Sequence, residues 1–178
     1  MKKTLIFLFF AGTIGMIFIM SDTGKTLSQP AATPHGILHL ELAYNKASTD
    51  TIMKAWETGG SGMIDNIAAA KNNTHWDFVF LFFYGGFLFL FCRQLAGSFN
   101  GFLKKAGNIF AVAALLAALL DVGENIGMLQ TLSGKGSDSI AMFTAICSGI
   151  KWVLVLLSIL YALVAGAGWI YKKFSGRS

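Results

Sequence analysis

Four long apolar segments constrain this chain more than any other feature of its sequence. They lie at about 4–20, 76–95, 106–130 and 142–171. Each has at least the ~17 residues that an α-helix needs to cross a hydrocarbon core about 30 Å thick. Charged residues make up only 13% of the 178 residues, against roughly a quarter in soluble globular domains. The sequence therefore predicts an all-α, polytopic membrane protein whose four transmembrane helices form one domain.

The basic residues indicate the orientation of these helices. The ends that would share one side of the membrane carry Lys2, Lys3, Arg93, Lys104, Lys105, Lys172, Lys173 and Arg177. The other two loops, about 21–75 and 131–139, carry both signs of charge. By the positive-inside rule, both termini are expected in the cytoplasm. The first segment is expected to remain as a helix, because it exceeds a usual signal-peptide core and lacks an A-x-A-like cleavage site.

The net charge of +5 does not indicate a nucleic-acid partner. Basic residues at helix ends act as topology signals and contact anionic lipid head groups, and the chain has no basic stripe with interleaved aromatic residues. The expected partners are membrane lipid and, in an alternative interpretation, other membrane protein subunits. Cys92 and Cys147 are expected at different membrane depths, too far apart for a disulfide.

The segment 21–75 is expected to form a helical extracytoplasmic cap. Its "ILHLELAYN" alternates leucines with period two, but no partner strand is evident and a lone strand is unstable. A short amphipathic helix lying on the membrane is therefore favoured. A helix is expected through "STDTIMKAW", with Ser48, Thr49 or Asp50 as its N-terminal cap. The glycine-rich "TGGSG" at 58–62 is expected to end this helix. "MIDNIAAAKNN" predicts a further short helix.

Polar side chains inside the last three apolar segments form the candidate site. In "LLDVGEN", Asp121, Glu124 and Asn125 share one helical face, since residues i, i+3 and i+4 do. Counting 1.5 Å per residue from the outer helix ends places Tyr84, Asp121 and Lys151 in one layer of the membrane. We therefore expect Lys151 to pair with Asp121 or Glu124. The opposite face of the same helix is apolar and includes Leu115, Leu116 and Leu119.

These groups are expected to line an interior pocket, because a charged side chain in hydrocarbon costs roughly 2.5–3.5 kcal/mol on insertion scales. Ser148 is a hydrogen-bonding companion, and Asp77 is expected to be solvated at the outer rim. If all three acids are ionised against Lys151, the net charge is −2, so one acid is protonated or the site holds a cation or water. The sequence predicts a pocket among the second, third and fourth helices that binds a small amphiphile, a lipid head group or a cation.

The motifs "ELAYN…IMKAW", "WDFVFLFFYGG", "LLDVGEN" and "KWVLVLL" occur in this order between residues 41 and 157. Their pattern resembles that of a loosely defined group of small bacterial four-helix membrane proteins. The resemblance implies the same architecture and a bacterial cytoplasmic membrane. It also draws attention to Glu41 and Trp56, which with His75 are candidates to cap the pocket. It implies no reaction.

Other interpretations remain open at this point. A buried Asp–Lys pair could serve only to fix helix register. The chain could be a non-enzymatic accessory subunit of a larger complex, which docks through Gly123 and Gly127 on the outward face of their helix. It could also be an intramembrane enzyme that modifies lipid with Asp121 or Glu124 as general acid or base, although a non-enzymatic role is favoured.

A metal site receives less support from the sequence. His35 and His39 have the i, i+4 spacing that zinc sites use, and Glu41 follows them. Gly36 weakens a helix at this point, and the sequence does not indicate a third strong ligand at a suitable position. We expect no metal and no cofactor, and the common soluble catalytic motifs do not occur.

Overall fold

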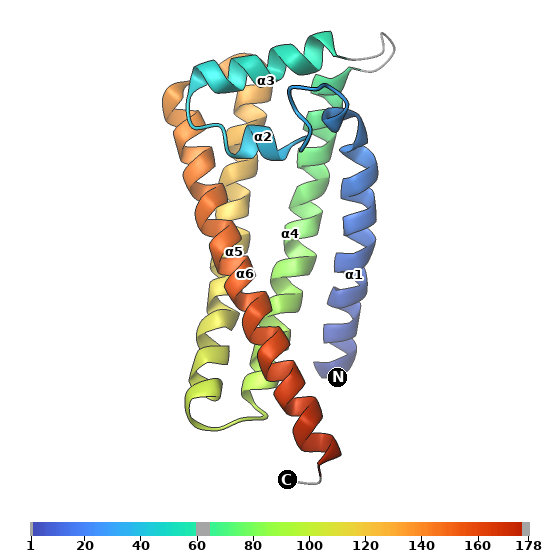
Figure 1. Ribbon diagram of the computed structural model, residues 1–178, viewed down its shortest axis with the longest axis vertical. Coiled ribbons are helices and arrows are strands. Elements are labelled where there is room, and N and C mark those ends of the chain that lie inside the picture. The colour runs from blue at the N-terminus through green and yellow to red at the C-terminus, as the bar shows by residue number, and fades with distance from the viewer. Residues whose placement is uncertain (1, 60–64, 176–178) are drawn as a thin grey trace.

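The computed structural model describes residues 2–59 and 65–175. Four long helices form a bundle (Figure 1), namely α1 (Lys2–Thr23), α4 (Asn66–Ala96), α5 (Gly101–Gln130) and α6 (Asp138–Phe174). All four are long and apolar enough to cross a membrane. Even α1, with 22 residues, spans about 33 Å at 1.5 Å per residue. The prediction of an all-helical fold with four apolar spans is confirmed, and no strand occurs in the described residues.

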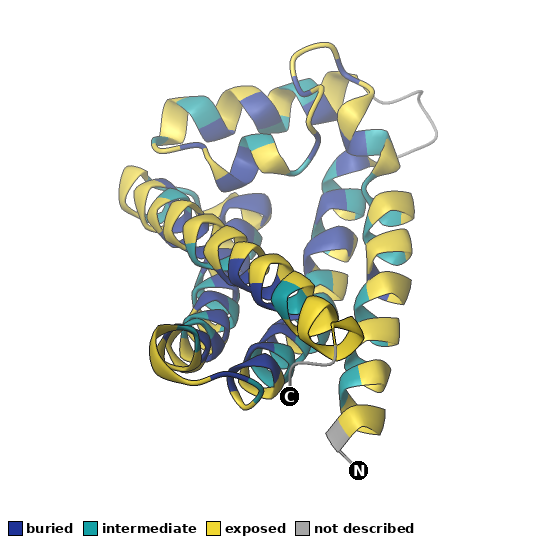
Figure 2. Ribbon diagram, turned by 60° about the horizontal axis from the view of Figure 1, so that its bottom comes forward, coloured by how far each residue is buried: buried dark blue, intermediate teal, exposed yellow. Residues whose placement is uncertain are grey.

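The bundle is organised around α5, which packs along both α4 and α6, whereas α1 packs mainly on α4. Small residues allow these close approaches: Ala111, Ala114 and Ala117 of α5 are fully buried. The apolar side chains on the opposite face are exposed, including Leu115, Leu116 and Leu119. Figure 2 shows the same division, with buried residues facing the interior of the bundle. The exposed apolar faces are those that lipid would cover.

Two glycines of α5 lie against α6. A β-carbon at Gly127 would come 2.1 Å from Thr144 Oγ1, and one at Gly123 would come 3.3 Å from the ring of Phe143. The expectation that these glycines lie on an outward face is therefore wrong. They allow α5 and α6 of the same chain to pack closely.

Replacing Gly127 with leucine is expected to destabilise the protein by about 1–3 kcal/mol, the usual cost of overpacking a tight contact. The side chain would meet Thr144, so α5 and α6 would have to separate. Heat unfolding in mild detergent measures the effect. Gly149→Leu is the matched control, because a β-carbon at Gly149 meets nothing within 4 Å. Equal midpoints for the two variants would contradict this account.

Three short helices connect α1 to α4 and cover one end of the bundle (Figure 1): η1 (Lys25–Ser28), α2 (Leu38–Glu41) and α3 (Lys46–Thr58). We call residues 24–59 the cap. The single turn of α2 agrees with the favoured helix and not with a strand. The predicted helix cap at 48–50 is wrong, because the side chain of Asn45 accepts from the backbone N of Ser48 at 2.8 Å and α3 begins at Lys46.

The helix predicted for "MIDNIAAAKNN" is not separate from the second transmembrane helix. Part of this stretch, and part of the predicted break at 58–62, lies outside the described residues. From Asn66 onward the chain is a single helix of 31 residues, because no glycine or proline interrupts it before Gly85. Its length of about 46 Å at 1.5 Å per residue exceeds a hydrocarbon core of about 30 Å. The N-terminal turns of α4 can therefore support the cap.

The cap has its own apolar core around Trp56. This side chain is fully buried among Leu27, Leu40, Met128 and Leu132. Its indole N–H donates to the carbonyl oxygen of Leu27 at 3.0 Å. Because Met128 belongs to α5 and Leu132 to the wide turn η2 (Thr131–Lys135) that links α5 to α6, this core fastens the cap to the bundle.

Candidate functional site

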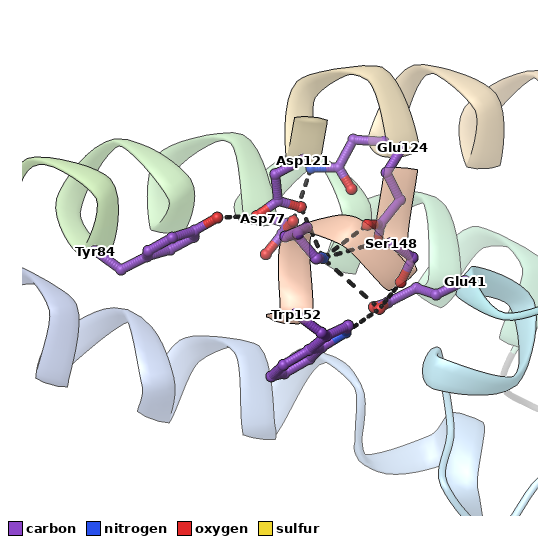
Figure 3. Close-up of polar contacts among 9 residues, drawn as sticks. Glu41, Asp77, Tyr84, Asp121, Glu124, Ser148 and Trp152 are labelled. Atoms are coloured by element: carbon purple, nitrogen blue, oxygen red, sulfur yellow. Dashed lines mark hydrogen bonds and ion pairs between the residues drawn. The ribbon is translucent and has the colours of Figure 1, made fainter. Parts of the chain in front are cut away.

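An ion-pair cluster lies inside the bundle at the end nearest the cap. Lys151 Nζ on α6 lies 3.0 Å from Asp121 Oδ1 and 2.8 Å from Glu124 Oε2, both on α5. It also lies 3.7 Å from Oε2 of Glu41, which is in α2. Figure 3 shows the three carboxylates converging. All four residues are buried, Glu124 completely so. One ammonium group thus joins the cap to two long helices.

Helix α4 contributes two further members of the cluster. The hydroxyl of Tyr84 donates to Asp121 Oδ2 at 2.7 Å, and Asn125 Nδ2 donates to Asp77 Oδ2 at the same distance. The structure therefore brings together the polar residues of the three helices, as expected from their common depth in the membrane. Asp77 is expected from the sequence to be solvated at the outer rim. In the structure it is half-buried and hydrogen-bonded to Asn125.

Glu41 reaches the cluster from the cap. Its Oε2 accepts from the hydroxyl of Ser148 at 3.3 Å and from the indole N–H of Trp152 at 3.4 Å. The ring centroid of Trp152 lies 5.5 Å from Lys151 Nζ. Sequence reasoning did not select Trp152, since position i+1 lies about 100° away from the face of Lys151. Only the length of the indole brings it back to the cluster.

The other candidates from the cap are placed differently. Trp56 lies in the cap core and not in the cluster. His75 is exposed on α4, where its ring contacts the carbonyl oxygen of Lys71 at 2.6 Å. The rings of His35 and His39 stack with centroids 5.5 Å apart. Among the described residues, no group of three or more His, Cys, Asp or Glu side chains has the arrangement of a metal site.

A cavity of about 370 Å³ adjoins the cluster. Its polar end is formed by Glu41, Asp77, Tyr84, Asp121, Lys151 and Trp152. The remaining wall is almost wholly apolar and comprises Thr13, Ile17, Met20, Phe80, Phe87, Leu88, Val155 and Ile159. Its size falls within the range of small-molecule sites, about 300–1,000 Å³. The cavity is thus polar at one end and apolar along its length.

Helix α1 forms one wall of this cavity through Thr13, Ile17 and Met20. The pocket predicted from the sequence lies among the other three long helices and does not include α1. Because α1 packs on α4 and makes little contact with α6, the cavity lies between α1 and α6. It is therefore positioned at a lateral gap in the bundle.

The charges of the cluster do not balance. Among the residues that the structure describes, its carboxylates are Glu41, Asp77, Asp121 and Glu124, and its one ammonium is that of Lys151. With all of these ionised, the formal net charge is −3. In addition, Oδ1 of the fully buried Asn125 accepts no hydrogen bond within the described structure. Unpaired polar groups of this kind are rare in protein interiors and call for an explanation.

Comparisons with protein-family models, with curated proteins and with solved structures find no match. The geometry of this site is therefore the basis on which a function is inferred.

Proposed function

We propose that this protein binds a small amphiphile in the cavity between α1 and α6. The polar head would rest against the ion-pair cluster, and the apolar chain would lie along Ile17, Phe87 and Val155. The observation that carries this proposal is that one cavity has charged side chains at one end and apolar side chains elsewhere. Ligand sites typically combine an apolar lining with a few polar groups that fix orientation.

A purely structural role accounts less well for the same residues. Replacing a buried ion pair with apolar side chains is often neutral or stabilising, so helix register alone does not call for so many charges. An ion pair that only fixed the register of α5 and α6 would need no more than Asp121 and Lys151. Here Glu41 and Asp77 add further negative charge, and both line the cavity. This additional negative charge at the cavity wall supports the binding of a ligand there.

We further propose that the cap lies outside the cytoplasmic membrane and that the cavity faces the outer leaflet. The support is the distribution of charge along the bundle. Both termini lie at the end opposite the cap (Figure 1). The helix ends on that side carry Arg93, Lys104, Lys105, Lys172 and Lys173, as the positive-inside rule expects of a cytoplasmic side.

Native mass spectrometry of protein extracted gently from its own membrane tests the binding proposal. The unmodified protein is expected to retain a small amphiphile. Val155→Phe should abolish this retention, because Val155 lines the cavity and the larger ring would fill the space of the chain. Val153→Phe is the matched control, since Val153 is 57% exposed on the outer face of α6.

Two outcomes would contradict the proposal. One is unmodified protein that carries no amphiphile, and the other is equal retention by both phenylalanine variants. The same experiment tests the remaining alternatives. Co-purifying proteins without a small ligand would favour an accessory subunit. A chemically altered lipid that disappears in Glu124→Gln would favour a lipid-modifying enzyme.

A further inference from the structure

We propose that the amphiphile bound in this cavity has a cationic head group, an amine or quaternary ammonium, which lies against Asp77 and Glu41 beside the ring of Trp152. This inference rests on the proposed function and specifies the chemistry of the ligand. It depends on three features of the cavity, namely its unbalanced charge, its aromatic side chain and its apolar wall.

Lys151 already has carboxylate partners within the cluster. Its ammonium lies within 3.0 Å of both Asp121 and Glu124, so these two carboxylates have their partner. Glu41 lies farther from it, at 3.7 Å. Asp77 makes no ion pair with any described residue and accepts a hydrogen bond from the neutral amide of Asn125. With all four acids ionised, the surplus negative charge therefore lies at Asp77 and Glu41, and both face the cavity.

The aromatic side chain at the cavity wall suits the same ligand. Trp152 is 41% exposed and lines the cavity. Its indole N–H end points to Glu41, to which it donates (Figure 3), and this bond holds the ring in place. Tryptophan is the side chain whose ring attracts cations most strongly. Lys151 Nζ already lies 5.5 Å from the ring centroid and 3.7 Å from Glu41. A cationic head on the side of Asp77, away from this ammonium, would meet carboxylates and the aromatic ring together.

The apolar wall distinguishes an amphiphile from a bare metal ion. A hard cation needs several oxygen ligands around it, whereas most of this cavity is lined by side chains such as Phe80, Phe87 and Ile159. An anionic head is also disfavoured, since the ammonium of Lys151 is already surrounded by carboxylates and a phosphate would approach Asp77 and Glu41. Two like charges about 4 Å apart repel by about 4 kcal/mol at an effective dielectric constant of about 20.

Photolabelling with three amphiphiles tests this inference. Each probe has the same dodecyl chain with a diazirine, and the head is trimethylammonium, hydroxyl or sulfate. The full-length protein is placed in nanodiscs of zwitterionic lipid, and labelled peptides are mapped by mass spectrometry. Labelling of the cavity residues Phe87, Leu88 and Val155 is divided by labelling of the exposed Leu156 and Leu160. This ratio corrects for the partition of each probe into the lipid.

The trimethylammonium probe is expected to label the cavity about tenfold more than the hydroxyl probe, which corresponds to about 1.4 kcal/mol. The sulfate probe should label it least. Asp77→Asn should remove most of this preference, because it removes a carboxylate from the cavity wall without touching the ion pairs of Lys151. Glu57→Gln, an exposed acid of α3, is the matched control and should retain the preference.

The results separate this inference from the proposed function. Equal labelling by the hydroxyl and trimethylammonium probes, or stronger labelling by the sulfate, would overturn the cationic head and leave the amphiphile site intact. Retention of the preference in Asp77→Asn would overturn the role of Asp77. Labelling that never exceeds that of the lipid-facing leucines, with any probe, would overturn the proposed function as well.

Discussion

Replacing Lys151 with methionine is expected to lower the free energy of unfolding by about 3–5 kcal/mol, the usual effect of removing one partner from a buried ion pair. The substitution would leave Asp121 and Glu124 buried without the ammonium that lies within 3.0 Å of each. Heat or dodecyl sulfate unfolding in mild detergent measures the change. Lys105→Met, which removes an exposed cation of α5, is the control and should shift the midpoint little.

A compensating variant shows whether charge causes this loss. Lys151→Met combined with Glu124→Gln carries one less unpaired carboxylate, and it should be more stable than Lys151→Met alone. If the double variant is no more stable than Lys151→Met, the loss of stability comes from the packing of the lysine side chain and not from its charge. A Lys151→Met protein that unfolds at the same midpoint as the unmodified protein would show that the cluster does not depend on its ammonium.

Replacing Trp56 with alanine is expected to detach the cap while leaving the four long helices assembled. Truncation of a buried tryptophan costs about 3–5 kcal/mol, and here it also removes the hydrogen bond to Leu27. Amide hydrogen exchange should accelerate by at least about tenfold in α2 and α3, since each 1.4 kcal/mol lost is a factor of ten. Exchange within α5 and α6 should stay slow.

The control for this experiment is Trp76→Ala, because Trp76 of α4 is 40% exposed and does not belong to the cap core. It should leave exchange in the cap unchanged. Detaching the cap would also withdraw Glu41 from Lys151, so amphiphile retention should fall in Trp56→Ala. Acceleration spread evenly over all helices would contradict this account, because it would mean that the cap and the bundle unfold as one unit.

Much of the bundle could be predicted from the sequence because a membrane permits few solutions. Helices satisfy every backbone polar group internally, so apolar length predicted the four spans. Helical periodicity predicted that Asp121, Glu124 and Asn125 share an interior face. Counting residues from the helix ends placed Tyr84 and Lys151 near them, and the structure has these groups in contact. No knowledge of distant contacts was needed for these predictions.

The cap and its contribution to the site could not be predicted in the same way. The helical part of α2 has only 4 residues, too few for a clear period. The direction of Glu41 depends on the cap core around Trp56, which joins parts of the chain far apart in sequence. The wall formed by α1 was missed for another reason. Apart from Thr13, residues 5–20 are apolar or glycine, so their pattern gives too little indication of which side faces the cavity.

The ion-pair cluster has a consequence for the biosynthesis of this protein, because its members are made in a fixed order. Glu124 precedes Lys151 by 27 residues. At about 5–20 residues per second, the ribosome needs about 1–5 s to add the lysine after the glutamate. During this interval α5 carries two acids into the membrane without their cation. We expect the insertion machinery to hold α5 until α6 arrives and to release the two helices as a pair.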